Sequence, residues 1–384
     1  MPDTLRLSFS ILLFLCSLLT ILRAPHYVLW KLAVGITEFP HVTILLGLIS
    51  LSLHSISHQY VLAGDLLSLA AIILFSVPLV LAYPTASGSA RLFNAARSET
   101  AFRFSILFTG YRNKKLAPKT ITYKKLNEKE LKLDFYPGNS DQNAPCVIVV
   151  HGGSWSSGDS TQLPDLNFYL ASKGFNVASI NYRLAPAHIC PAPVEDLLDA
   201  INFLKDRSSE LKIDASNIIL LGRSAGGQIA LLAAYSRSVP GLKGVISFYA
   251  PADMVWGWSL PGNPLVLDSR KVMKDFVGDT CENAPEKFAA ASPIEFVTAN
   301  SIPTLLIHGN NECMVAHEHS VRLAKKLKEN KVEHYLVSLP WGTHGCDFNL
   351  SGPSGQISTF AVLQFLNKIC GGKMDNGTGG MEHG

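Results

Sequence analysis

Apolar positions dominate the first 83 residues and fall into three runs. The runs are Leu5–Leu22, Tyr27–Leu53 and Tyr60–Tyr83. A helix needs about 20 apolar residues to cross a bilayer, so the first and third runs each predict a transmembrane helix. The second run is interrupted by Lys31, Glu38 and Pro40 but is long enough to predict a third. We therefore expect residues 1–83 to form a multi-pass membrane segment of three transmembrane helices.

The first run has an alternative interpretation as a cleaved signal peptide. Asp3 offsets Arg6, and no clean small-residue cleavage site follows the run, which favours a retained helix. Basic residues then orient the segment, because cytoplasmic loops carry an excess of Lys and Arg. Arg23 lies between the first two runs and Lys31 near the start of the second, and residues 54–59 carry no Lys or Arg. More basic residues follow the third run: Arg91, Arg97, Arg103, Arg112, Lys114, Lys115 and Lys119. This distribution predicts an outside N-terminus and a cytoplasmic C-terminal region.

Residues 84–119 form a basic, amphipathic linker. Its arginines alternate with apolar side chains, namely Leu92, Phe93, Phe102, Phe104, Leu107 and Phe108. Such a pattern is typical of a helix that lies in the headgroup plane of a membrane. It also fits a linker helix that packs on the domain after it, and both alternatives remain open. The basic residues from 112 to 119 would favour anionic lipid in either case.

From about residue 120, short apolar runs alternate with helical patterns. The runs predict an edge strand at Leu131–Tyr136 and further strands at Cys146–Val150, Asn176–Tyr182, Asn217–Leu221, Gly244–Tyr249, Thr304–His308 and His334–Ser338. The patterns between them predict helices at Asp165–Lys173, Val194–Lys205, Gly226–Tyr235, His317–Lys328 and Ile357–Asn367. This alternation predicts an α/β domain over residues 120–370, with a mostly parallel central sheet flanked by helices. In such sheets the chemistry gathers at the carboxyl ends of the strands.

Two stretches depart from the alternation. Residues 251–290 contain Trp256, Trp258 and several prolines, and we interpret them as a short cap over the site. Residues 371–384 are rich in glycine and predict a flexible tail. Its Asn376-Gly-Thr378 glycosylation sequon would matter only on the lumenal side, which the predicted orientation excludes.

Composition adds few constraints. The 384 residues are 47% hydrophobic and only 16% charged, against about a quarter charged in ordinary soluble domains. The net charge of +3 does not suggest nucleic-acid binding as a main task. The seven cysteines are scattered without a disulfide or metal-ligand spacing, so we expect reduced thiols, with a bond between Cys313 and Cys346 left open. Nothing in the sequence calls for a metal or an organic cofactor.

The candidate chemistry begins at Gly222-Arg223-Ser224-Ala225-Gly226. This stretch follows the predicted strand at Asn217–Leu221 and precedes a predicted helix. A serine between two glycines at such a junction is typical of a nucleophile elbow, in which a tight turn lifts the hydroxyl above the sheet.

Three other stretches complete a pattern. The first is His151-Gly-Gly-Ser-Trp155, which follows the predicted strand at Cys146–Val150, and the second is Tyr182-Arg-Leu-Ala-Pro186, which begins at the end of the next predicted strand. The third is a pair of residues late in the sequence: Glu312, three residues after His308-Gly309, and His344, between Thr343 and Gly345. Together with the elbow, they make residues 120–370 resemble an α/β-hydrolase of the carboxylesterase and lipase kind. The branch that they resemble includes hormone-sensitive-lipase-like esterases and the kynurenine formamidase group.

The resemblance implies a role for each residue. Ser224 would be the nucleophile, His344 the base that takes its proton, and Glu312 the acid that orients the imidazole. Asp253 and Asp347 are alternatives to Glu312. The oxyanion hole would involve Gly152, Gly153, Ser154 and Ala225, and the substrate pocket would involve Trp155, Trp256 and Trp258. We assign Tyr182–Pro186 a structural role beside the oxyanion loop.

The predicted protein is therefore a membrane-anchored serine hydrolase that cleaves carboxylic esters through an acyl-enzyme. Its expected partners are a small-molecule or lipid-like ester and membrane lipid. Because His-Gly-Gly-x-Trp is nearer to the formamidase form of the oxyanion motif, an arylformamidase-like amide hydrolase is an alternative. A non-catalytic ligand receptor on the same fold is another. The sequence determines neither the acyl group nor the oligomeric state.

Overall fold

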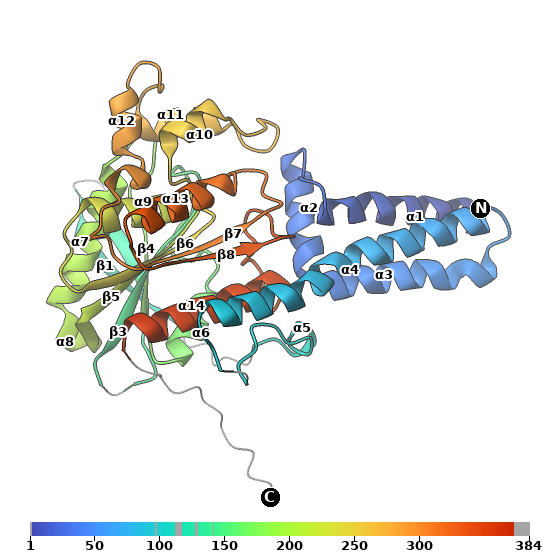
Figure 1. The fold of residues 1–384 in the computed structure, drawn as a ribbon, viewed down its shortest axis with the longest axis horizontal. Helices are drawn as coiled ribbons and strands as arrows, with labels where there is room; N and C mark the ends of the chain where they lie inside the picture. Colours follow the sequence, from blue (N-terminus) through green and yellow to red (C-terminus); the bar gives the residue numbers. More distant parts are fainter. Residues whose placement is uncertain (1, 97, 112–116, 127–129, 141, 372–384) are drawn as a thin grey trace, which may run out of the picture.

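The structure is a computed structural model that describes residues 2–96, 98–111, 117–126, 130–140 and 142–371. It has two parts, a narrow helical bundle and a larger α/β domain (Figure 1). The bundle contains α1 (Pro2–Ser17), α2 (Tyr27–Glu38), α3 (Pro40–Ser52) and α4 (Val61–Leu92), with 3₁₀ turns at Leu18–Thr20 and Leu53–Ile56. Helices α1, α3 and the first half of α4 lie side by side and extend away from the domain, with the N-terminus at the far end (Figure 1).

A cluster of serines joins the three long helices of the bundle. The hydroxyl oxygens of Ser10, Ser50 and Ser68 lie 2.8–3.1 Å from one another, and all three side chains are buried. Hydroxyl groups that bond across helices are a common device for joining helices where the surroundings are apolar. The three hydroxyl groups therefore satisfy one another inside the bundle.

The second apolar run does not form one straight helix. It breaks at Phe39–Pro40, where α2 and α3 meet at an angle of 91°. Pro40 occupies the first turn of α3, where its missing N–H costs nothing. Two helices, Asp3–Thr20 and Val61–Leu92, are long and apolar enough to cross a membrane, and the bent pair α2–α3 would count as a third. A single straight helix over Tyr27–Leu53 therefore does not form, and α2 lies across the base of the bundle (Figure 1).

The boundary expected at residue 83 does not separate two structural parts. Helix α4 continues to Leu92, and its second half packs against α14 (Pro353–Ile369) of the α/β domain. Among the described residues that follow in the linker, α5 (Ile106–Thr109) forms a single helical turn, and Phe102 and Leu107 are buried in the core of the domain. Of the two alternatives for this segment, the structure favours packing on the domain. Arg97, Arg112, Lys114 and Lys115 lie outside the described residues.

One sheet forms the centre of the α/β domain. Its order is β1-β2-β4-β3-β5-β6-β7-β8, and every neighbouring pair from β4 onward is parallel. The strands are β1 (Lys119–Lys125), β2 (Glu130–Tyr136), β3 (Ala144–Val150), β4 (Asn176–Ile180), β5 (Ile213–Arg223), β6 (Leu242–Phe248), β7 (Thr304–Gly309) and β8 (His334–Leu339). The predicted mostly parallel sheet is confirmed. The strand at Leu131–Tyr136 is not at the edge, because β1 pairs with it antiparallel on the outside.

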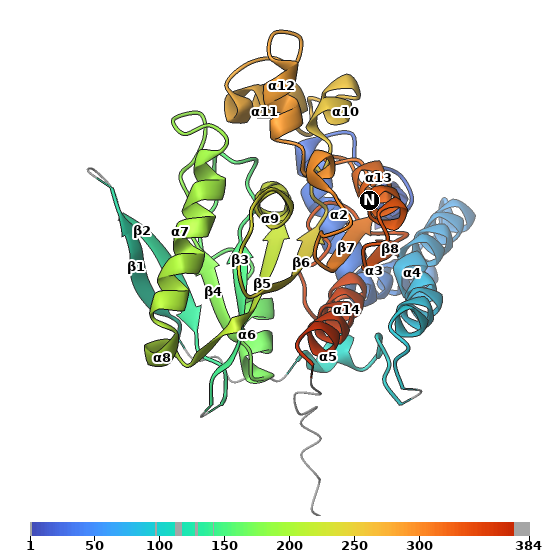
Figure 2. The same cartoon turned by 60° about the vertical axis from the view of Figure 1, so that its left-hand side comes forward.

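Helices cover both faces of the sheet (Figure 2). Cys146, Ile148 and Val150 of β3 face the core that includes α7, α9 and α13, whereas Val147 and Val149 face α6 and α14. The remaining helices are α6 (Asp165–Ser172), α7 (Ala192–Asp206), α8 (Ser208–Leu211), α9 (Ala225–Ser236), α10 (Met254–Ser259), α11 (Ser269–Val277), α12 (Pro285–Ala290) and α13 (Glu318–Glu329), with a 3₁₀ turn at Pro293–Phe296.

The region expected to be a cap connects β6 to β7. It contains the short helices α10, α11 and α12, which lie beyond the carboxyl ends of β5 and β6 (Figure 2). This is the end of a parallel sheet at which functional loops gather. The predicted tail, with its sequon at Asn376, lies almost wholly outside the described residues.

Candidate active site

Ser224 lies at the sharp turn between β5 and α9. Its backbone has φ 53° and ψ −121°, a conformation that non-glycine residues rarely adopt. The glycines on either side are required by close contacts, because a Cβ on Gly222 would collide with the carbonyl oxygen of Gly226, and one on Gly226 would collide with that of Val150. The turn therefore has the form of a nucleophile elbow.

The structure brings Ser224, His344 and Glu312 into contact. Nε2 of His344 lies 3.0 Å from Oγ of Ser224, and Nδ1 lies 3.0 Å from Oε2 of Glu312. Glu312 comes from the loop after β7, and His344 comes from the loop after β8. Both distances allow hydrogen bonds. The arrangement matches the geometry by which a base activates a hydroxyl and an acid orients that base.

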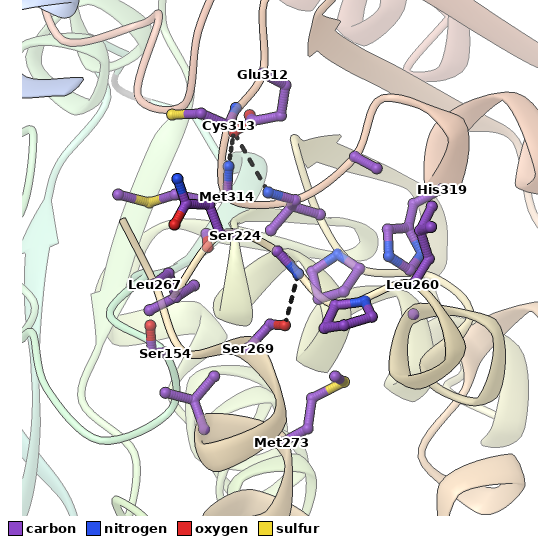
Figure 3. A pocket seen from close by; sticks show the side chains of 18 of the residues that line it. Ser154, Ser224, Leu260, Leu267, Ser269, Met273, Glu312, Cys313, Met314 and His319 are labelled. Carbon is purple, nitrogen blue, oxygen red and sulfur yellow. Dashed lines mark hydrogen bonds between the residues drawn. The ribbon is translucent and has the colours of Figure 1, made fainter. Parts of the chain in front are cut away.

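The Glu312 carboxylate is buried but well supplied with donors. Its second oxygen, Oε1, accepts from the backbone N–H groups of Cys313, Met314 and Val315 at 2.8–3.3 Å (Figure 3). Burial alone would raise the pKa of Glu312, but the charge and hydrogen bond of His344, with smaller contributions from its other neighbours, lower it below its ordinary value. Glu312 is therefore ionised at neutral pH and can stabilise an imidazolium on His344.

A second histidine, His308, lies beside the same carboxylate. Burial lowers the pKa of His308 to about 4, so its ring is neutral at pH 7. Its Nε2 lies 2.9 Å from the carbonyl oxygen of Val315 and its Nδ1 lies 2.8 Å from the hydroxyl of Ser320. A neutral ring that donates to Val315 and accepts from Ser320 uses both nitrogens. His308 thus leaves Glu312 available to His344.

The two alternative acids are committed to other partners. Asp347 forms a buried ion pair with Arg223, from Nε to Oδ2 at 2.5 Å, and accepts a hydrogen bond from the Tyr249 hydroxyl. Asp253 pairs with Arg322 and caps the start of α10. Neither carboxylate bonds to His344 in the described part of the chain. The geometry therefore favours Glu312 over both.

Three backbone amides point to an anion site beside Ser224. The N–H groups of Gly153, Ser154 and Ala225 have no acceptor within the described residues. Ala225 is the first residue of α9, where the amides have no partner within the helix and favour negative charge. The fourth predicted residue, Gly152, needs correction: its N–H donates to Oε1 of Gln162 at 2.7 Å. Gly152 instead allows the backbone to approach Ser224 closely.

The Tyr182–Pro186 motif supports the oxyanion loop. The Tyr182 hydroxyl donates to the carbonyl oxygen of His151, and its ring stacks on the His151 imidazole with centroids 4.3 Å apart. Arg183 pairs with the buried Asp196 of α7 through Nε at 2.8 Å. These contacts hold the loop after β3 against its neighbouring strand and against α7.

Two adjoining cavities meet at Ser224. The first, of about 490 Å³, is lined by Trp155, Ala225 and Met273 together with residues of the cap (Figure 3). The second, of about 590 Å³, is lined by His344, Gly153 and several residues of α2. Volumes of this size suit small-molecule ligands. The two cavities share Ser154, Ser224, Leu267 and Met314.

The prediction that Trp256 and Trp258 line the substrate pocket is wrong, because neither residue lines either cavity. Helix α10 turns Trp256 onto the ring of His319, with centroids 4.8 Å apart, and Trp258 onto Phe288. The Trp258 N–H donates to Glu282 at 2.7 Å. Trp256 thus packs α10 on α13 and Trp258 packs it on α12, whereas Trp155 reaches the cavity and stacks on Phe276.

The cysteines carry no cross-link in the structure. All seven are free thiols, and Cys313 lies near Thr343 with Sγ 3.6 Å from Oγ1. The described residues include no group of three or more His, Cys, Asp or Glu side chains suited to a metal ion.

Sequence reasoning missed two residues that touch His344. The Tyr249 ring lies 4.5 Å from the imidazole, centroid to centroid, and Trp30 of α2 donates its indole N–H to the His344 carbonyl oxygen at 2.9 Å. The position of Tyr249 directly after β6 was a usable signal, because functional residues follow parallel strands. Trp30 is 314 residues away in the sequence and offered no signal.

Known proteins resemble the α/β domain. Esterase LipC of Mycobacterium tuberculosis is 29% identical over 245 residues, which cover 59% of this chain and 59% of LipC. Carboxylesterase NlhH of the same organism is 33% identical over 129 residues, or 33% of this chain and 40% of NlhH. The chain thus spans less than two thirds of the length of these curated relatives.

Solved structures and a family model define the relationship further. A bacterial heroin esterase has a TM-score of 0.58 at 22% identity and covers 66% of this chain and 84% of its own. An acetyl ester-xyloside bifunctional hydrolase from Caldicellulosiruptor lactoaceticus has a TM-score of 0.56 at 23% identity, and the match covers 67% of this chain and 98% of that hydrolase. At these identities the likeness establishes the fold, which is that of an α/β-hydrolase. The BD-FAE family model matches residues 133–327, or 195 of 384 residues. The chain therefore belongs to the BD-FAE family, within the carboxylesterase and lipase-like α/β-hydrolases.

Proposed function

We propose that this protein is a serine hydrolase that cleaves carboxylic esters. The observation that carries the proposal is the position of His344, which lies 3.0 Å from both Ser224 Oγ and Glu312 Oε2. Beside this contact, the amides of Gly153, Ser154 and Ala225 face the same site without acceptors among the described residues. The esterases LipC and NlhH among its relatives support the same reaction class.

The proposed mechanism follows from these positions. His344 accepts the proton of Ser224 as Oγ attacks the ester carbonyl, and the amides of the oxyanion loop and Ala225 stabilise the negative oxygen. His344 then returns the proton to the leaving alcohol, which leaves an acyl-Ser224 ester. Water, activated by the same imidazole, hydrolyses that ester to the carboxylic acid. Glu312 remains ionised and holds the imidazole in the tautomer that keeps Nε2 free to accept.

A comparison of substrates tests the reaction class. The purified full-length protein is assayed with p-nitrophenyl acetate and, in parallel, with N-formylkynurenine. Ester turnover that exceeds formamide turnover supports the proposal. Turnover of the formamide alone would establish the arylformamidase alternative, and turnover of neither, with no labelling by a fluorophosphonate, would establish the receptor alternative.

Replacing Glu312 by glutamine is expected to lower kcat by about 10²–10⁴-fold with little change in KM. The amide is neutral, so it no longer stabilises the imidazolium and no longer selects the productive tautomer. Steady-state kinetics with p-nitrophenyl acetate measure the effect. Glu318→Gln, an exposed change nearby at the start of α13, is the matched control. Wild-type kcat in Glu312→Gln would exclude Glu312 as the acid.

We also propose that the N-terminal bundle anchors the enzyme in a membrane. Its far end is polar: Arg6 pairs with Asp65, and Asp3 accepts hydrogen bonds from Ser57 and from the amides of His58 and Gln59. Between that end and the α/β domain, many large apolar side chains are exposed, including Leu12, Leu15, Leu45, Ile73 and Val80. Exposed apolar surface of this extent suits hydrocarbon better than water. Because the three helices run back and forth, the domain and the N-terminus would lie on opposite sides (Figure 1).

Protease protection tests this orientation. Arg23 and Lys31 lie at the domain end of the bundle, and Asp65 neutralises Arg6 at the far end, so the positive-inside rule favours a cytoplasmic domain. In sealed right-side-out vesicles, the α/β domain is expected to be digested only after lysis. Digestion in intact vesicles would reverse the orientation, and release of the protein by carbonate washing would exclude membrane insertion.

A further inference from the structure

Helix α2 belongs to the membrane segment but forms a wall of the active site. Tyr27, Trp30, Val34 and Gly35 line the cavity of about 590 Å³ that also contains Ser224 and His344. The Trp30 indole donates to the His344 carbonyl oxygen, and the two rings lie 6.4 Å apart, centroid to centroid. The cavity is therefore incomplete without the membrane segment.

Helix α2, which lines this cavity, lies at the base of the bundle (Figure 1). Because α2 meets α3 at 91°, it runs across the bundle axis, which places it parallel to the plane of a membrane that the bundle crosses (Figure 1). Apolar side chains from the domain are exposed beside it: Leu265, which is 64% exposed and whose carbonyl accepts the Tyr27 N–H, and Phe348, which is 55% exposed and lines the cavity. Val28 and Leu32 of α2 are also exposed. An apolar rim of this kind fits the boundary between headgroups and acyl chains.

The position of His344 decides which half of an ester this cavity receives. The imidazole must return its proton to the leaving oxygen, so the alcohol has to lie on the side of His344. His344 lines the cavity beside α2 and is not among the residues that line the cap cavity. The other cavity, of about 490 Å³ beneath the cap, is lined by Ala225, Trp155 and Met273. Because the alcohol lies on the side of His344, this cap cavity is left for the acyl group.

We propose that the substrate is an ester of a long-chain alcohol embedded in the bilayer, and that its alkyl chain enters the α2 cavity from the membrane. This inference rests on the proposed ester hydrolysis. Ser224 Oγ forms a bond to the acyl carbon, the bond from that carbon to the alcohol oxygen breaks, and His344 protonates the alcohol. One water molecule then releases the acid. The alcohol returns to the bilayer along the path by which it entered.

A substitution at Gly35 can fill this cavity without disturbing the fold. A Cβ on Gly35 would meet no atom within 4 Å, and the residue lies inside α2, where leucine is a better helix former than glycine. Gly88 of α4 is a matched control. Its Cβ position is equally open, and it lines a separate cavity formed by α4 and the end of β8. Gly35→Leu therefore changes the space beside His344, whereas Gly88→Leu makes the same change elsewhere.

The test uses the full-length protein in phosphatidylcholine vesicles with three probes: p-nitrophenyl acetate, hexadecyl acetate and p-nitrophenyl palmitate. Gly35→Leu is expected to lower kcat/KM for hexadecyl acetate by about tenfold or more, because the filled space no longer admits the chain. The kcat/KM of Gly88→Leu is expected to stay within about twofold of wild type for all three probes. Gly35→Leu is expected to lose less activity on p-nitrophenyl acetate than on hexadecyl acetate, because p-nitrophenyl acetate carries no long alkyl chain.

The outcomes separate this inference from the function on which it rests. An unchanged rate of Gly35→Leu on hexadecyl acetate would overturn the inference, as would a wild type that cleaves p-nitrophenyl acetate but not hexadecyl acetate. A loss confined to p-nitrophenyl palmitate would place the acyl chain in the α2 cavity and also overturn it. A wild type that cleaves none of the three probes would instead refute the proposed esterase function.

Discussion

Replacing Ser224 by alanine is expected to lower kcat/KM for p-nitrophenyl acetate by about 10⁴-fold or more. Without Oγ there is no nucleophile for an acyl-enzyme, and the imidazole can act only on water. The residual rate would come from the oxyanion amides and substrate binding, which the substitution leaves in place. Labelling by a fluorophosphonate, which requires the serine oxygen, is expected to disappear completely.

Ser236→Ala is the matched control for this change. Ser236 ends the same helix, α9, and its hydroxyl donates to the carbonyl oxygen of Leu232, far from the elbow. It is expected to retain wild-type activity and labelling. Hydrolysis by Ser224→Ala at the wild-type rate would exclude Ser224 as the nucleophile, whatever else in the site is correct.

Replacing Asp347 by alanine is expected to destabilise the protein by about 3–5 kcal/mol, because it leaves a buried charge without its partner. The side chains of Arg223 and Asp347 are only 2% and 3% exposed. Arg223 also lies directly before Ser224, so its displacement is expected to disturb the elbow. Urea titration of the detergent-solubilised protein, followed by tryptophan fluorescence, measures the loss.

Two further variants separate the cause from a general packing defect. The double variant Arg223→Met with Asp347→Leu removes both charges, and it is expected to recover most of the lost stability. Asp275→Ala breaks an exposed ion pair with Lys271 on α11 and is expected to cost about 0–1 kcal/mol. A double variant as unstable as Asp347→Ala would show that the unpaired charge is not the cause.

Contacts in and next to α2 connect the N-terminal bundle to the active-site loops of the α/β domain. Trp30 bonds to the His344 loop, Asn263 Nδ2 bonds to the Pro25 carbonyl oxygen, and Asn349 bonds to the carbonyl oxygen of Glu38. The bundle thus contacts the loops that carry the site at several points. An enzyme truncated before the α/β domain would lose one wall of its site as well as its proposed anchor.

Local patterns in the sequence were sufficient for the sheet and for the predicted triad. The strands were recognisable because a parallel sheet buried on both faces requires continuous apolar runs such as Cys146–Val150. The elbow was recognisable because its close contacts admit only glycine at positions 222 and 226. Glu312 and His344 were recognisable through the resemblance to α/β-hydrolases, which place these residues after strands of one parallel sheet whose carboxyl ends meet at one edge.

Other features depend on contacts that no local pattern records. Trp256 and Trp258 looked like pocket residues because aromatic side chains suit both cavities and cores, and only their neighbours Phe288 and His319 placed them in the cap. Gly152 looked like an oxyanion donor until Gln162 was seen to accept its N–H. The break at Phe39–Pro40 turned an expected membrane span into an active-site wall.

The sequence by itself determined the α/β architecture, the order of the candidate catalytic residues and the presence of an apolar N-terminal segment. These properties follow from hydrophobic periodicity and from the steric needs of one turn, which act over a few residues. Only the tertiary structure decided that Glu312, and neither Asp253 nor Asp347, contacts His344, and that α2 closes the site. Those outcomes depend on which side chains meet across hundreds of residues, as Trp30 and His344 do, and that is set by the packing of the whole chain.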